Sequence, residues 1–173
     1  MTMQLFAVTL GGRAPKGNTE LHDVVFVSGE TIEATYDQLL AKWFGQPQRL
    51  HLDSWIAVDV VDGHRVRLGE ASDSTKRLYF VNLGAYAAET FAEVHANGLF
   101  VAETREDAKI RAKTILFKDW PSDVHTDDVI DVGESLGMPL ALEPTDAAAD
   151  LKPVNGYHPL PQDVIAAFVR SQG

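Results

Sequence analysis

Histidine and aspartate recur in a short pattern that suits a base, a ligand site or a metal site. His51 and Asp53 stand two residues apart in an alternating segment, so we expect both side chains on one face of a strand. A neighbouring carboxylate fixes the tautomer of an imidazole and raises its basicity, as a general base requires. The alternative is a hydrogen bond that satisfies two half-buried polar groups. Trp55 would continue this face as an apolar wall.

The polar loop after Gly11 and Gly12 is a second candidate. The two glycines would let backbone N–H groups approach an anion, to which Arg13 would add its guanidinium. The other polar residues that we place at this ligand-binding loop are Asn18, Glu20, His22 and Asp23. The alternative is a loop whose polar side chains bind only its own backbone.

Metal binding is the third hypothesis, because four of the six histidines form two matched pairs, His22 with His95 and His51 with His125. Such histidines could converge on zinc or another divalent ion. However, no HxH, HExxH or other tight spacing supports a metal site, and gene duplication explains the matching. The sequence therefore predicts no metal and no other cofactor.

The elements that must position these residues occur twice. The segment LFAVTLG at residues 5–11 aligns with LYFVNLG at residues 78–84, an offset of 73 (78 − 5). Glu20 and His22 fall on Glu93 and His95 at the same offset. His51 and Asp53 fall on His125 and Asp127 at an offset of 74 (125 − 51). Because rare residue types keep this register, we infer an internal duplication.

Each copy predicts the same order of elements. In the first copy we expect a strand at 5–10 that ends in a Gly11-Gly12 turn, a loop at 11–21, and a buried strand at 23–27. An amphipathic helix follows at 32–43 with Gly45 as its C-cap, then an alternating strand at 50–61. Asp62-Gly63 predicts a hairpin turn that leads into 65–68. In the second copy Thr104 and Asp107 predict a capping box, and the helix that follows has the apolar stripe Ala108, Ala112, Ile115 and Leu116.

These elements indicate an α+β fold: a duplicated ββαβ(β) unit in a pseudo-twofold arrangement, with mainly antiparallel sheets and helices on one face. The domains we predict are a first repeat at 1–68, a linker at 69–77 and a second repeat at 78–138. A tail at 139–173, punctuated by prolines and without a counterpart in the first copy, would end in a short helix near 162–170 and clamp the body.

Composition excludes several classes of protein. The chain has no cysteine, which excludes disulfides and thiolate chemistry. Its formal net charge of −10 opposes binding to nucleic acid or to an anionic membrane. A local basic patch would have to come from Arg65, Arg67, Lys76 and Arg77. No apolar run spans a bilayer and the first residues do not resemble a signal peptide, so we expect a cytoplasmic protein.

The segment LFAVTLGGRAP at residues 5–15 resembles the opening signature, LFAV-x-LGGR-x-P, of a bacterial family known as domain of unknown function 1543. Similar segments follow at 20–27, 43–45, 51–55 and 78–84. The resemblance covers residues 4–134 and is looser in the second copy, where Ala85-Tyr86 replaces Gly12-Arg13. It implies a two-copy member and carries no assigned activity.

Two classes of function remain open. The favoured one is a non-catalytic module, monomeric or homodimeric, that binds a small molecule or a protein. We place its site in the first copy, which keeps Arg13 and Trp55 where the second has Tyr86 and Val129. The alternative is a hydrolase or isomerase that uses the His51–Asp53 pair or His22 as general base.

Overall fold

The computed structural model describes residues 2–70, 73–120 and 123–173. In these residues the chain forms eleven strands in three antiparallel sheets, with three α-helices, so the predicted α+β class is confirmed. The chain divides into two compact units, Met1–Asp59 with Asp150–Gly173, and Val60–Ala149. This division differs from the predicted boundaries, because residues 60–68 group with the second unit and the last 24 residues (173 − 149) with the first.

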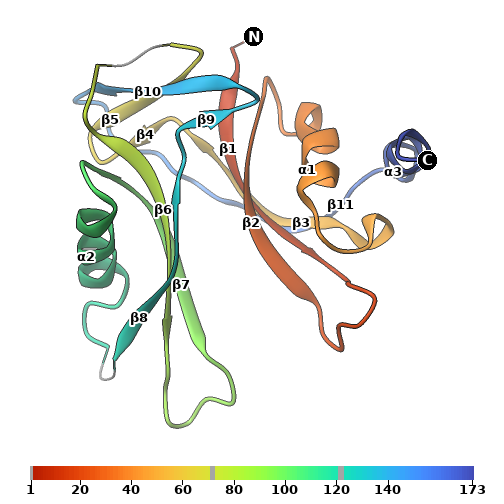
Figure 1. The fold of residues 1–173 in the computed structure, drawn as a ribbon, viewed down its shortest axis with the longest axis horizontal. Helices are drawn as coiled ribbons and strands as arrows, with labels where there is room; N and C mark the ends of the chain where they lie inside the picture. Colours follow the sequence, from red (N-terminus) through yellow and green to blue (C-terminus); the bar gives the residue numbers. More distant parts are fainter. Residues whose placement is uncertain (1, 71–72, 121–122) are drawn as a thin grey trace. The chain divides into compact units, whose positions relative to one another are not determined.

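The first unit is a four-stranded sheet in the order β11-β3-β1-β2, with helices on one face (Figure 1). Its elements are β1 (Gln4–Gly12), β2 (Leu21–Gly29), α1 (Tyr36–Lys42), β3 (His51–Val58), β11 (Val154–Pro159) and α3 (Gln162–Ser171). The helix predicted near 162–170 is therefore present as α3, and β11 extends the sheet beside β3.

A single apolar core holds the helices against this sheet. Phe6, Val8 and Leu10 alternate along β1 and meet Leu39 of α1 and Ile165 of α3. Gln38 adds a polar contact, because its amide group exchanges two hydrogen bonds with the backbone of Ser28 in β2, at 2.7 and 3.1 Å. This contact fixes α1 along the strand.

The second unit contains two sheets, β7-β6-β8 and β4-β5-β10-β9. The first comprises β6 (Arg77–Ala85), β7 (Val94–Ala102) and β8 (Val124–Asp131), with α2 (Arg105–Leu116) packed on one face (Figure 1). The second comprises β4 (Val60–Val61), β5 (His64–Leu68), β9 (Glu134–Ser135) and β10 (Met138–Pro144). Thr104 is the N-cap of α2, since its hydroxyl accepts a hydrogen bond from the Asp107 N–H at 3.1 Å and donates one to the Asp107 carboxylate at 2.6 Å.

The strands of the two copies pair in the same register. Gly11 lies between His22 and His51, and Gly84, 73 positions later (84 − 11), lies between His95 and His125. All nine residue pairs of β1 with β2 recur at this offset in β6 with β7. This equivalence is what a duplicated unit requires, and it supports that inference.

The equivalence continues beyond the predicted end of the second repeat. The β4–β5 hairpin turns at Asp62 (φ 48°) and Gly63 (φ 70°), and the β9–β10 hairpin turns at Leu136 (φ 54°) and Gly137 (φ 71°). The offset is again 74 (136 − 62), so β10, predicted as tail without a counterpart, is the equivalent of β5. The two hairpins also pair symmetrically, Val66 with Leu142 and Leu68 with Leu140.

Several local predictions are wrong. Gly11 and Gly12 lie inside β1 and form no turn. Gly45 is not a left-handed C-cap, because its φ is not positive; an added Cβ there would lie 2.7 Å from the Trp43 indole nitrogen, so close packing explains the glycine. Ile115 is 58% exposed and does not belong to the buried stripe, whereas Ala108, Ala112 and Leu116 pack against the core of the second unit. Part of the predicted linker at 69–77, residues 71–72, lies outside the described residues.

Within the described residues, the helices are all too short or too polar to cross a membrane.

Leu136 provides a test of the hairpin equivalence. A left-handed backbone costs a residue with a Cβ roughly 1–2 kcal/mol, whereas glycine adopts it freely. We expect the free energy of unfolding of the Leu136→Gly variant to be about 1 kcal/mol higher than that of the Leu136→Ala variant. Urea denaturation measures both values. Both variants lose the same exposed side chain, so the alanine variant is the matched control. Equal stabilities would show that this turn is not left-handed.

Candidate functional site

The central strand of the first unit has a glycine where two histidines meet. Gly11 of β1 pairs with His22 of β2 on one side and with His51 of β3 on the other. Residues directly opposite in antiparallel strands point to the same face of a sheet. Both imidazoles therefore extend over Gly11, on the face opposite the helices, where no side chain separates them.

A β-bulge turns Asp53 into the same place. Thr9 pairs with Ser54 and Leu10 with Leu52, so Asp53 is left without a partner in β1. Bulges redirect a side chain and are frequent beside functional sites. Here the bulge brings the Asp53 carboxylate 3.3 Å from His51 Nε2 and 3.2 Å from His22 Nε2.

Glu20, the residue before β2, completes the first cluster, which we define as Glu20, His22, His51 and Asp53. Its Oε1 lies 3.5 Å from His22 Nε2 and 3.4 Å from His51 Nε2. Each imidazole thus faces one oxygen of both carboxylates at nearly equal distances. Glu20, His51 and Asp53 have one possible ligand atom each, all within 4.8 Å of one another.

Gly11 is required by this convergence. A Cβ added there would lie 2.5 Å from His51 Nε2 and 2.7 Å from Asp53 Oδ2. Both distances are shorter than any real Cβ contact, so a larger residue would displace the cluster. The glycine makes room for side chains from neighbouring strands.

The backbone orients His51. Its Nδ1 lies 3.1 Å from the Arg49 carbonyl oxygen, which can only accept a hydrogen bond. Nδ1 therefore carries the proton, and the Nε2 lone pair of the neutral ring points at Glu20 and Asp53. A lone pair aimed at two carboxylates is stable only with a cation between them, either a proton or a metal ion.

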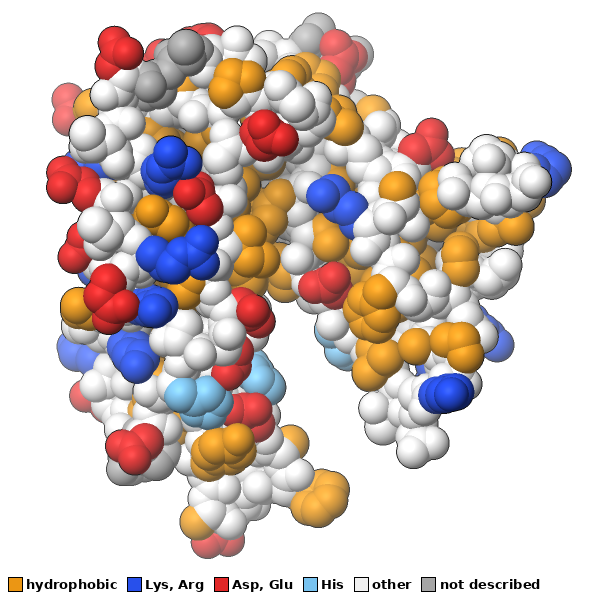
Figure 2. All heavy atoms as spheres, viewed as in Figure 1, with side chains coloured by type: hydrophobic (Ala, Val, Ile, Leu, Met, Phe, Trp, Pro, Cys, Tyr) orange, Lys and Arg blue, Asp and Glu red, His pale blue; other side chains and the backbone are white. Residues whose placement is uncertain are grey.

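The second unit repeats the arrangement in the second cluster, defined as Glu93, His95, His125 and Asp127. Asp127 also lies in a bulge, since Asn82 pairs with Asp128 and Leu83 with Thr126. The Nε2–oxygen distances are 2.5 and 3.1 Å for His125, and 3.3 and 3.4 Å for His95. In Figure 2, histidine side chains lie beside acidic ones in the lower part of the view, where the ends of β6 and β7 that are joined by a loop lie in Figure 1.

One carboxylate oxygen in each cluster is buried without a hydrogen bond. These atoms are Asp53 Oδ2 and Glu93 Oε1. Each still lies within ion-pair distance of an Nε2 atom, of His22 and His125 respectively. Each oxygen thus faces an imidazole nitrogen, and a proton or another cation between the two atoms would satisfy it.

Among the described residues, Arg13 and Trp55 make contacts outside the first cluster. The Arg13 guanidinium donates to the Asn18 carbonyl at 3.3 Å, which matches the alternative of a loop that binds its own backbone. Trp55 packs against the apolar core and has its ring 4.8 Å from that of His158. The bulge at Asp53 reverses the alternation of β3, so the prediction that Trp55 shares a face with His51 is wrong.

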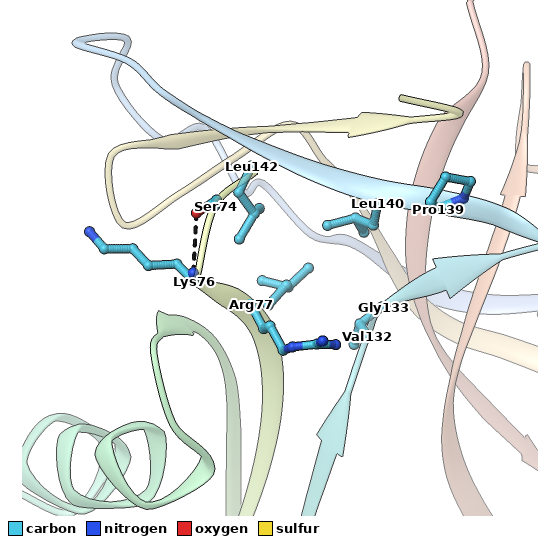
Figure 3. A pocket seen from close by; sticks show the side chains of 9 residues that line it. Ser74, Lys76, Arg77, Val132, Gly133, Pro139, Leu140 and Leu142 are labelled. Atoms are coloured by element: carbon cyan, nitrogen blue, oxygen red, sulfur yellow. Dashed lines mark hydrogen bonds between the residues drawn. The ribbon is translucent and has the colours of Figure 1, made fainter. Parts of the chain in front are cut away.

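Two of the four residues that could have formed a basic patch pair with acidic neighbours. Arg67 pairs with Glu143 at 3.4 Å, and Arg77 pairs with Asp131 at 3.1 Å. A cavity of about 330 Å³ in the second unit is lined by Lys76, Arg77 and apolar residues such as Leu140. Figure 3 shows the Lys76 side chain extending away from the other labelled side chains. The cavity thus offers little that would recognise an anion.

Gly11→Ala tests the requirement for space. Alanine normally stabilises a strand relative to glycine, but here overpacking of His51 and Asp53 should lower the free energy of unfolding by about 1–3 kcal/mol. Gly17→Ala is the control, because its nearest heavy atom to an added Cβ is at 3.4 Å. Urea denaturation should show a change within about 0.5 kcal/mol for the control. A stable Gly11→Ala variant would contradict this geometry.

Comparisons with known proteins agree with this architecture. The model of a family described as Domain of Unknown Function (DUF1543) matches residues 17–68, which include all four residues of the first cluster. The crystal structure of protein Il1583 from Idiomarina loihiensis is similar over 92% of this chain and 99% of that chain, with 34% sequence identity and a TM-score of 0.73. No curated protein matches the chain. The chain belongs to the DUF1543 family.

Proposed function

We propose that this protein binds divalent metal ions, one in each cluster of two histidines and two carboxylates. This proposal keeps the predicted class of a small-ligand-binding protein and replaces the expectation that no metal is bound. The observation that carries it is the same in both units: every Nε2 atom faces both carboxylates of its cluster at 2.5–3.5 Å.

Most of these distances suit ligands of a common ion. Nitrogen and oxygen ligands bind zinc at about 2.0–2.2 Å in tetrahedral sites, which separates neighbouring ligand atoms by roughly 3.3–3.5 Å. In the first cluster the four imidazole–carboxylate separations run from 3.2 to 3.5 Å. The first cluster therefore already has the spacing that an ion would give it, whereas His125 Nε2 and Glu93 Oε1, at 2.5 Å, would have to move apart to bind one.

Charge supports the same conclusion. Two carboxylates and two neutral imidazoles carry a charge of about −2, which one divalent ion neutralises. An ion pair between protonated histidines and carboxylates would use the same atoms, so metal binding must be measured directly. Nitrogen and oxygen donors without cysteine suit zinc and neighbouring transition metals, and imidazoles disfavour calcium and magnesium.

The enzyme alternative has less support. A general base must reach the proton that it abstracts from a substrate. His51 is 3% exposed, and its Nε2 faces two carboxylates of its own cluster. His22 is more exposed, but it faces the same carboxylates. Hydrolase or isomerase activity, a protein partner, homodimer formation and a cytoplasmic location stay predictions.

Zinc stoichiometry tests the proposal. Purified protein, stripped with a chelator and equilibrated with micromolar zinc by dialysis, should bind two ions per chain by elemental analysis. His22→Ala and His95→Ala should each bind one, because each change removes an exposed ligand from one cluster. Loss of a residue that binds the metal directly should lower the zinc affinity of that site by more than roughly 100-fold. Even residues that only support such ligands contribute roughly 10- to 100-fold to metal affinity.

His158→Ala is the matched control, because this histidine lies on β11 against Trp55 and outside both clusters. It should still bind two ions. If wild-type protein binds no zinc, cobalt or nickel in stoichiometric amounts, the clusters are ion pairs and the proposal is wrong.

A further inference from the structure

The two clusters have the same donors but different surroundings. The His51 side chain is 4% exposed, whereas that of its equivalent, His125, is 42% exposed. Their partners on the second strand, His22 and His95, are similarly exposed at 54% and 48%. The carboxylates differ in the opposite sense, with Glu20 and Asp53 42% and 32% exposed and Glu93 and Asp127 25% each, so the greater exposure of the second cluster is at His125, on β8.

Strand β11 causes this difference. It pairs with β3, with Pro159 opposite His51 and Asn155 opposite Ser54. The register shifts between these pairs, and the Tyr157 ring lies 4.5 Å from the His51 ring. Tyr157, itself 71% exposed, thus places its ring against that of His51 on the β3 side.

On the equivalent side of the second cluster, β8 has no further strand beside it in the described part of the chain, so His125 lacks the neighbouring strand that β11 gives His51. The sheet there is β7-β6-β8, with β8 at its edge. The ring next to His125 is that of Tyr86, at 5.5 Å and nearly parallel, and Tyr86 is itself 62% exposed. Tyr86 stands where the first copy has Arg13, so His51 and His125 each lie beside a tyrosine ring, but the two rings come from different elements.

We propose that the metal ion in the second cluster accepts a small anion as an additional ligand from the side of His125, and that Tyr157 prevents this in the first. The inference rests on the proposed metal binding. Metal sites that act on or bind other molecules keep a coordination position open to solvent, whereas structural sites close it. The chain has a net charge of −10 and as a whole repels anions, but a bound cation would attract an anion locally.

Cobalt-loaded variants and the anion azide provide the test. His22→Ala should retain cobalt only in the second cluster, and His95→Ala only in the first. Azide should then change the visible cobalt spectrum of His22→Ala saturably, and leave that of His95→Ala unchanged. Tyr157→Ala combined with His95→Ala should gain the azide response, whereas Val154→Ala, on the same strand, should not.

The outcomes separate the two proposals. If neither variant binds cobalt, metal binding itself fails. If both bind cobalt and azide affects both equally, affects neither, or affects only the first cluster, metal binding stands and the open second site is wrong. If Tyr157→Ala does not open the first cluster, Tyr157 is not the barrier and the inference is likewise overturned.

Discussion

The site depends on one steric constraint, the missing side chain at the centre of three strands. Antiparallel pairing directs the residues on either side of Gly11 and Gly84 to the same face as the glycine. Two imidazoles can then approach over the central strand, and a bulge in the outer strand adds the aspartate. In the second unit, as in the first, an added Cβ would collide with a histidine and an aspartate. The glycine, the bulge and the four polar side chains therefore form one structural motif, which occurs once in each unit.

The duplication that we infer would account for the two clusters, and the last segment of the chain for their difference. The strands, bulges and hairpins are equivalent, and only the first unit has β11 beside its third strand. That strand lies in the Pro-punctuated tail, but the β10 part of the same tail belongs to the repeat. A tail that covers one of two equivalent sites allows them to differ without a change in their donors.

Much of this was accessible from sequence, because rare residues keep their register in a duplicated chain. The match of Glu20, His22, His51 and Asp53 with Glu93, His95, His125 and Asp127 in the sequence includes all eight cluster residues. The bulges were not predictable, since strict alternation places His51, Asp53 and Trp55 on one face. Gly11 was assigned to a turn because glycine pairs usually mark turns; its recurrence as Gly84 was the signal that it serves the site. The cover by Tyr157 depends on long-range pairing of β11, which no local pattern indicates.

The central claim is that two imidazoles and two carboxylates in each unit surround one metal ion. X-ray absorption at the zinc edge of the loaded protein tests this most directly. The account predicts a first shell of about four nitrogen and oxygen atoms at roughly 2.0–2.1 Å, with outer-shell scattering from two imidazoles per zinc. A shell of water oxygens without imidazole scattering, or with a single imidazole, would contradict it.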